Sequence, residues 1–197
     1  MFNFEKDIVL ENDVVRMRPL RKDDTKHLLV FSEKEPDLWK FSLTSASGTE
    51  NLGTYIDAAL KARNEQKEYP FIIFDKQTNS YAGSSRFYDF QLNQQTVLIG
   101  YTWYGKAHQG TGLNKNCKYL MLSYAFENLK MKRVEFRADI NNEKSIRAMK
   151  SIGCKEEGVL RNHLQLPDGK RRSSIVLSIL EEEWLGGVKN NLHKALG

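Results

Sequence analysis

The chain has 197 residues, of which 40% are apolar and 28% charged, a composition typical of a globular protein with a sizeable core. No apolar stretch approaches the ~20 residues that span a bilayer, and no signal peptide is apparent. Two cysteines cannot form a disulfide framework or a four-ligand zinc site. We therefore expect one domain over residues 1–197, cytoplasmic, without a metal and away from membranes.

The formal net charge of +5 is unevenly distributed along the chain. Residues 101–197 hold 17 Lys and Arg against 10 Asp and Glu, whereas residues 1–100 hold 13 against 15. This asymmetry indicates that the second half meets an anion, although a solvated basic face explains it as well.

The first hundred residues alternate between helical and strand patterns. Val14 to Arg18 alternates as a strand and stops at Pro19, and Asp23-Asp24 is a capping signal for a helix through Phe31. Residues 33–48 are expected to be loop or broken helix. The remaining predictions are a helix over 49–65 and strands over 71–74, 81–90 and 96–104.

The second half predicts a different order of elements. A glycine-containing loop at 105–112 precedes a helix to about Asn128, and Gly153 is a good C-cap for a helix over 142–152. The turn signal Pro167-Asp168-Gly169 separates two strands. Those strands are expected at 159–166 and 174–180, after a short strand at 133–138 and before a terminal helix at 181–196, which Gly186-Gly187 weakens.

The loop from Gln109 to Asn114 is the most informative segment. Its two glycines allow a tight turn and a close approach to a ligand, and the following helix presents unpaired N–H groups. Together they form a cradle suited to a pyrophosphate. The segment has no Gly-Lys-Ser/Thr of a Walker loop, and Lys115 occupies the position of the third glycine of a Rossmann fingerprint.

The strand and loop from Ile99 to Asn114 resemble motif A of the GNAT superfamily of N-acetyltransferases, written Q/R-x-x-G-x-G/A. Gln109 to Leu113 match, and Asn114 stands where Gly or Ala is usual. Three further segments resemble family patterns in the right order. Val14 to Leu20 resembles an L-R-L-R-P-L opening, Asn142 to Cys154 resembles N-x-x-S…G-F, and Glu157 to Arg161 resembles the E-G-x-L-R of the RimJ/RimL branch, which includes acetyltransferases of ribosomal-protein N-termini.

The resemblance implies an α/β (α+β) fold with a mixed, twisted sheet of six or seven strands, helices on both faces, and acetyl-CoA as co-substrate. The pantetheine arm is expected to pair with the strand around Trp103, and the N–H groups of residues 110–114 to hold the pyrophosphate. The expected cofactor-binding residues are Thr102, Trp103, Tyr104, Gln109, Gly110, Thr111, Gly112, Leu113, Asn114 and Asn142.

The catalytic residues are less evident. In the RimL-like pattern the acid that protonates the leaving sulfur maps to Ser145, whereas helix capping is the alternative role for Ser145 and Asn142. Two other family positions depart from the usual residue, with Met149 in place of a Tyr and Leu98 in place of a Glu. No general base is visible, and the nearest alternatives are Glu157 and His163, each of which also suits a surface or structural role.

Several other side chains can be interpreted either as functional or as structural. Lys106, Lys115 and Lys118 flank the loop and could meet phosphates or simply solubilise the surface. The segment Lys170 to Arg172 is most simply a solvated hairpin tip. The following aromatic residues could wall an acceptor pocket or belong to an ordinary core: Trp39, Phe41, Tyr88 and Trp103.

These observations favour an acetyl-CoA-dependent transferase that acts on a primary amine. A protein N-terminal α-amine is one acceptor class, and a small-molecule amine is the alternative. A non-catalytic CoA-binding regulator also remains open, because of the residues at 98 and 149. No nucleic-acid partner is expected, and a monomer or a homodimer would suit the domain.

Overall fold

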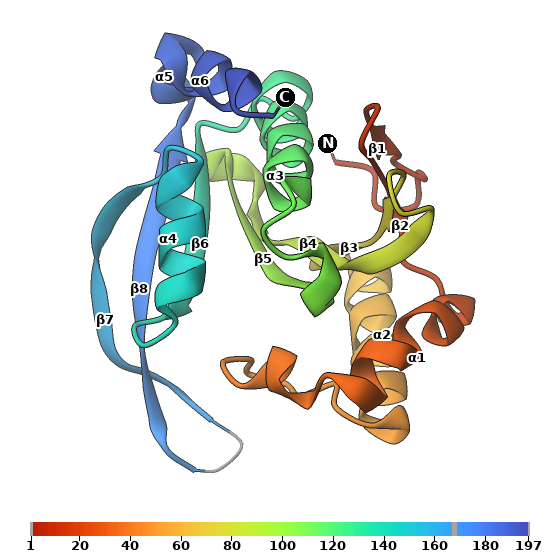
Figure 1. Cartoon of the computed structure of the whole chain (residues 1–197). Helices are drawn as coiled ribbons and strands as arrows, with labels where there is room; N and C mark the ends of the chain where they lie inside the picture. Colours follow the sequence, from red (N-terminus) through yellow and green to blue (C-terminus); the bar gives the residue numbers. More distant parts are fainter. Residues whose placement is uncertain (1, 167–168, 197) are drawn as a thin grey trace.

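The computed structural model of the chain describes residues 2–166 and 169–196, and its centre is a mixed β-sheet (Figure 1). The strands lie in the order β1-β2-β3-β4-β5-β6-β8-β7. Neighbouring strands are antiparallel except β5 and β6, which are parallel. The strands are β1 Leu10–Glu11, β2 Val15–Pro19, β3 Glu68–Asp75, β4 Ser80–Gln91, β5 Thr96–Tyr104, β6 Arg133–Asp139, β7 Lys155–Gln165 and β8 Arg171–Leu180.

Helices cover both faces of the sheet (Figure 1). The helices are α1 Thr25–Lys34, α2 Thr49–Asn64, α3 Leu113–Ser123, α4 Glu143–Ser151, α5 Glu181–Glu183 and α6 Lys189–Lys194. One core joins α3, α4 and α6 to the sheet through side chains such as Ile99, Met121 and Trp184. A second core joins α1 and α2 to the opposite face, with Leu28 and Ile56 among its buried residues.

The predicted α/β class, with helices on both faces of a mixed sheet, is confirmed. The sheet of the described residues has eight strands, where the resemblance implied six or seven. The additional edge strand is the two-residue β1, which pairs with β2 through Leu10 and Met17. Its apolar residues are too few for an alternating pattern to be recognised in the sequence.

Several boundaries differ from the prediction for physical reasons. Asp24 precedes α1 but makes no capping hydrogen bond to that helix. Its carboxylate instead accepts two hydrogen bonds from Arg18, at 2.8 and 2.6 Å, and one from Arg21 N at 2.8 Å. The terminal helix is divided by Gly187, whose φ of 149° is not helical. The predicted turn at Pro167-Asp168 lies outside the described residues.

Strands β7 and β8 form a long hairpin beside β6, and the hairpin extends beyond the rest of the sheet (Figure 1). Strand β7 begins at Lys155, earlier than its sequence pattern suggested. Within the described residues, every helix is too short or too polar to cross a lipid bilayer.

Candidate active site

The parallel pairing of β5 and β6 lasts for only three residue pairs. Thr96–Leu98 pairs with Arg133–Glu135, after which β5 continues beside β4 while β6 continues beside β8. A cavity of about 900 Å³ lies where the two strands part. Because β5 has no strand partner on this side beyond Leu98, its edge presents backbone groups to the cavity.

Strand β5 contains a bulge at the edge of the cavity. Tyr101 and Thr102 both stand opposite Ser85 of β4, so β5 carries one extra residue there. Tyr101 takes a left-handed φ of 49°, which is uncommon for a large side chain. The buried guanidinium of Arg86 packs over the Tyr101 ring at 4.0 Å and pairs with Glu68 at 2.6 Å, which holds this conformation in place.

The loop between β5 and α3 forms the next wall of the cavity. Gly110 and Gly112 have φ of 78° and 88°, and a Cβ atom on either glycine would meet nothing within 4 Å besides the adjoining residues. Gln109 Nε2 donates to the Tyr104 carbonyl at 2.7 Å, which ties the loop to the end of β5. The open space, the glycines and the N-terminus of the 11-residue helix α3 fit a pyrophosphate group.

Helix α4 closes the cavity from the side of β6. Asn142 is its N-cap, and the side-chain oxygen accepts a hydrogen bond from Ser145 N at 3.1 Å. Asn142 therefore does cap helix α4, which was the alternative role considered for it. It uses the amide oxygen, so the amide nitrogen is the atom that could donate to a ligand. Ser145 is half-buried and lines the same cavity, as does the buried side chain of Met149.

The structure brings most of the expected site residues together. Thr111 and Leu113 do not line the cavity. The Thr111 hydroxyl donates to the His108 carbonyl at 3.0 Å, and Leu113 is buried in the core. The expected residues that do line it are Thr102, Trp103, Tyr104, Gln109, Gly110, Gly112, Asn114, Asn142 and Ser145.

The three lysines near the loop have different surroundings. Lys106 and Lys115 line the mouth of the cavity, and Lys144 of α4 contacts the side chain of Gln109 beside them. Lys118, by contrast, is only 5% exposed, so it is not a solubilising surface residue. Its place in the sequence agrees with burial, because it lies three residues before the buried Met121 on one helix face.

Aromatic side chains form the wall that faces α1 and α2. Trp39, Phe41, Tyr88 and Trp103, which the sequence singled out, all line the cavity. Tyr55 and Tyr101 line it too, and the sequence pattern did not indicate either of them. The buried Nε1 atoms of Trp39 and Trp103 and the Tyr55 hydroxyl have no hydrogen-bond partner among the described residues.

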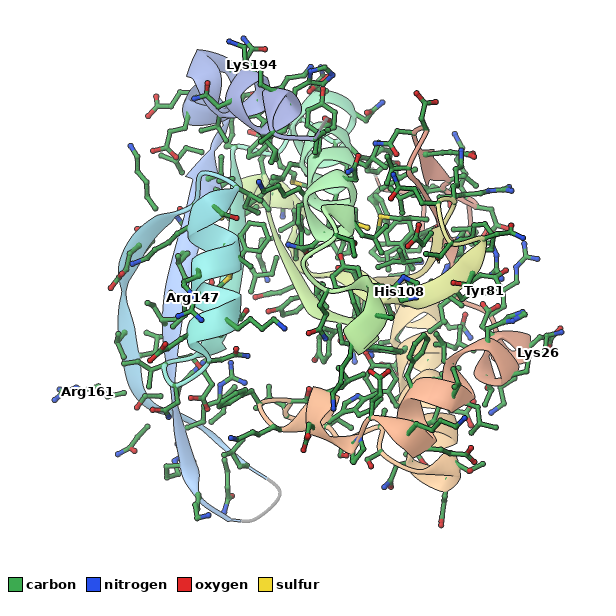
Figure 2. All side chains as sticks on the ribbon, viewed as in Figure 1. Lys26, Tyr81, His108, Arg147, Arg161 and Lys194 are labelled. Carbon is green, nitrogen blue, oxygen red and sulfur yellow. The ribbon has the colours of Figure 1, made fainter. Side chains whose placement is uncertain are left out.

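A polar rim lies along β6 and β8. Arg172 is not part of a solvated hairpin tip, because it is buried at 7% exposure and donates to the Phe41 carbonyl at 3.2 Å. Its guanidinium also lies 3.9 Å from the Asp139 carboxylate. Arg137 of β6 lines the same rim. By contrast, the Arg161 side chain points away from the sheet (Figure 2).

The two candidate bases are separated by the structure. His163 lines the cavity, and its Nδ1 lies 3.1 Å from the Ser174 hydroxyl. Burial lowers the pKa of His163, and the positive charges of Arg137 and Arg172 lower it further, so the neutral form is favoured. Glu157 does not line the cavity and is held by Ser178 and Arg133, whose hydrogen bonds lower its pKa.

Nucleophilic thiols and metal clusters do not contribute to this cavity. Cys117 and Cys154 are buried, and burial raises the pKa of each thiol to about 12. Residues 2–166 and 169–196 contain no cluster of three or more metal-ligating side chains. His108, which Figure 2 labels, belongs to the loop between β5 and α3 and lines the cavity, and its Nδ1 lies 2.9 Å from the buried Asp75 carboxylate.

Comparison with known proteins identifies the type of domain. A family model described as "Acetyltransferase (GNAT) domain" matches residues 15–155. The chain is 28% identical over 180 residues to the "Probable N-acetyltransferase YjcK" of Bacillus subtilis, which covers 89% of this chain and 98% of the relative. It is 36% identical over 96 residues to the "Putative ribosomal N-acetyltransferase YdaF" of the same organism, about half of each chain.

A solved structure agrees over the full length. The crystal structure of a "putative acetyltransferase" from T. thermophilus has a TM-score of 0.88 and 32% identity, and the match covers 100% of both chains. This likeness spans the sheet and both helical layers, which therefore belong to a shared fold.

Proposed function

The chain belongs to the GNAT family and is an N-acetyltransferase, and we propose that its acetyl transfer takes place in the cavity between β5 and β6, with a protein N-terminal α-amine as acceptor. The observation that carries this proposal is the parting of β5 and β6 directly below a glycine loop at the start of α3. One opening of this kind offers a phosphate cradle and a free strand edge to the same ligand. We take residues 1–197 as one transferase domain.

The residues around the opening suit acetyl-CoA, the co-substrate that the family implies. The amides of residues 110–114 would hold the pyrophosphate, with Lys115 and Lys144 close to it. The free edge of β5 at Thr102 to Tyr104 would pair with the pantetheine arm as an added strand. The amide nitrogen of Asn142 would donate to the same arm.

Acetyl-CoA supplies an acetyl group held as a thioester. In the reaction a bond forms between the acceptor nitrogen and the acetyl carbon, the carbon–sulfur bond breaks, and its electron pair stays on sulfur. The nitrogen loses one proton and the sulfur gains one. The Ser145 hydroxyl, which lines the cavity at the start of α4, is the proposed donor at the sulfur, and it regains a proton from solvent in the cavity. His163, with its lowered pKa, could accept the proton from the acceptor amine.

The need for a neutral amine favours an α-amine over a lysine side chain as acceptor. An α-amine has an unperturbed pKa of about 8, whereas a lysine side chain has about 10.4, so the α-amine is neutral far more often near pH 7. Arg137 and Arg172 on the rim favour a neutral amine over an ammonium ion. YdaF, which is similar to about half of this chain, is named a putative ribosomal N-acetyltransferase. These points support a protein N-terminus.

The test is the release of free thiol from acetyl-CoA with panels of peptides and small amines. We expect peptides with a free N-terminus to stimulate release, and the same peptides with a blocked N-terminus to be inactive. Stimulation by polyamines or amino sugars alone would reject the peptide acceptor. CoA binding without stimulation by any acceptor would instead favour a regulator.

The role of Ser145 is tested with Ser145→Ala. The hydroxyl is absent from this variant, but the backbone N–H that Asn142 caps is retained. We expect kcat to fall about 100-fold, with little change in CoA affinity. An unchanged kcat, where chemistry limits the rate, would remove Ser145 from the mechanism.

A further inference from the structure

A buried amine lies under the bulge of β5, where the strands part. Lys118 comes from the second turn of α3 and is 5% exposed. Its Nζ donates to the Thr102 hydroxyl at 2.7 Å and to the Ser85 hydroxyl at 3.2 Å. The two hydroxyls lie 2.7 Å from each other. Hydroxyl groups of two neighbouring strands therefore fix the position of the amine.

These hydrogen bonds do not supply a negative charge that would balance the charge of the amine. No carboxylate of the described residues lies within ion-pair distance of Lys118 Nζ, and both of its partners are neutral hydroxyls. A buried ammonium without a counter-ion is unfavourable, and an apolar side chain would fit among Cys117, Met121 and Leu122 at lower free energy. Such groups are found where the chemistry of a site needs them.

The amine also faces the cavity at a particular point. Lys118 is one of the residues that line it, and its Nζ lies 5.9 Å from the centre of the Phe136 ring on β6, across the gap. The hydroxyl it contacts belongs to Thr102, in the stretch of β5 proposed to pair with the pantetheine arm. The end of that arm, where the sulfur is, would therefore come close to the amine.

On the basis of the proposed function, we propose that Lys118 is a catalytic residue whose Nζ holds a positive charge at the thioester sulfur and stabilises the negative charge that the sulfur gains as the carbon–sulfur bond breaks. The lysine keeps its proton in this step, and the proton that the sulfur takes comes from Ser145. A fixed charge on a buried side chain acts strongly because little solvent screens it.

The active form of Lys118 is the protonated one. Burial lowers the pKa of Lys118 to about 8, so its charge is lost as the pH rises through that value. The titratable groups that act on it are the thiols of Cys117, on α3, and Cys154, between α4 and β7, and both stay neutral near pH 8. Strands β4, β5 and β6 bring Ser85, Thr102 and Phe136 against it, which do not titrate in this range.

The test compares CoA with desulfo-CoA, which lacks only the sulfur, on the wild-type protein. The side-chain nitrogen of Lys118 is followed by NMR in labelled protein during a pH titration, and Lys118→Arg identifies its signal. We expect CoA to raise the pKa of Lys118, because a thiolate pairs with the ammonium, and desulfo-CoA to leave it near its value in the free protein. By linkage, the pKa of the bound thiol should fall.

A variant tests the same role of Lys118 by enzyme kinetics. In Lys118→Met the thiol pKa of bound CoA should return to its value in free CoA, and kcat should fall about 100-fold with an unchanged KM for acetyl-CoA. The wild type should lose rate above pH 8, where Lys118 loses its proton, and Lys118→Met should not show this loss. Lys26→Met, an exposed position on α1, is the control with normal rate and pH profile (Figure 2).

The outcomes separate this inference from the function on which it rests. If CoA does not bind, the proposed function fails and the role of Lys118 fails with it. If CoA binds and has the same effect on Lys118 as desulfo-CoA, the role of Lys118 alone is overturned. The NMR titration uses the wild-type chain, so it decides the question even if Lys118→Met does not fold.

Discussion

Asn142 combines a structural contact with a free functional group. Its side-chain oxygen caps α4 by accepting from Ser145 N, so it fixes the start of the helix that carries Ser145. Its amide nitrogen makes no hydrogen bond within the described residues and lies at the cavity wall. Capping and ligand binding are therefore compatible in one side chain, and they can be separated by substitution.

Two substitutions at this position should give different results. Asn142→Asp keeps an oxygen that can cap α4 but removes the amide donor, so we expect an unchanged free energy of unfolding and about tenfold weaker CoA binding. Asn142→Ala removes both and should also lower the free energy of unfolding by about 1 kcal/mol. Calorimetric titration and urea unfolding measure the two effects. Full CoA affinity in Asn142→Asp would show that only the cap matters.

At the scale of elements, β5, the glycine loop and α3 form one unit. The Gln109 side chain fastens the loop to Tyr104 of β5, and Gly112 is the residue from which α3 begins. The unit positions the proposed phosphate cradle and Lys118 at the same cavity. The geometry of the loop therefore determines where a bound cofactor would lie along β5.

Gly112→Val tests the cradle directly. A side chain at this position meets open space, so the folded chain can accommodate it, although a φ of 88° makes the backbone strained by about 1 kcal/mol. The added methyl groups would occupy the room for the pyrophosphate, and we expect CoA affinity to fall at least about tenfold. Gly186→Val, with open space and no positive φ, is the control. A folded Gly112→Val that binds CoA normally would contradict the placement of the phosphates.

The sequence predicted part of this unit correctly. The apolar run of β5 and the glycines of the loop are local signals, and the predicted strand over 96–104 is the observed one. The bulge at Tyr101 depends on contacts with β4, and the hydrogen bonds of Lys118 depend on hydroxyls of β4 and β5, which no local pattern contains. The same reason explains why Tyr55 of α2 was missed, because only tertiary packing brings it to the cavity.

At the scale of the whole molecule, the charge asymmetry has a structural counterpart. Residues 106–155 hold 11 Lys and Arg against 4 Asp and Glu, and they form the loop, α3 and α4 around one end of the cavity. A field of this kind attracts a polyanion over a distance and is screened by salt.

The rate of CoA association should therefore depend on ionic strength. We expect the association rate constant to fall roughly tenfold between about 20 mM and about 300 mM salt. Pantetheine, which lacks the phosphates, is the matched ligand and should associate at a rate that salt does not change. Stopped-flow binding measures both. Equal salt dependence of the two ligands would exclude steering by this basic region.

The buried charge of Lys118 should also affect how the free energy of unfolding of the whole chain depends on pH. Its pKa is about 8 when folded and 10.5 in the unfolded chain. Between these values the unfolded state binds more protons, so the contribution of Lys118 to the free energy of unfolding rises with pH by about 3 kcal/mol and is constant below pH 8. At pH 7 the folded protein contains the unpaired charge.

Lys118→Met should thus be more stable than the wild type at pH 7, and its advantage should shrink as the pH approaches 10. The Ser85 and Thr102 hydroxyls can still bond to each other in the variant. The thiols of Cys117 and Cys154, with raised pKa values, lower the stability of both proteins at high pH, so the difference between them is the quantity to measure. Urea unfolding at pH 7, 8, 9 and 10 gives it. A difference that already falls by about 1.4 kcal/mol per pH unit between pH 7 and 8 would mean that Lys118 is neutral at pH 7, and a charge at the sulfur would then be excluded. A difference that does not change with pH would mean that the folded protein keeps Lys118 charged up to pH 10, which would contradict a pKa near 8.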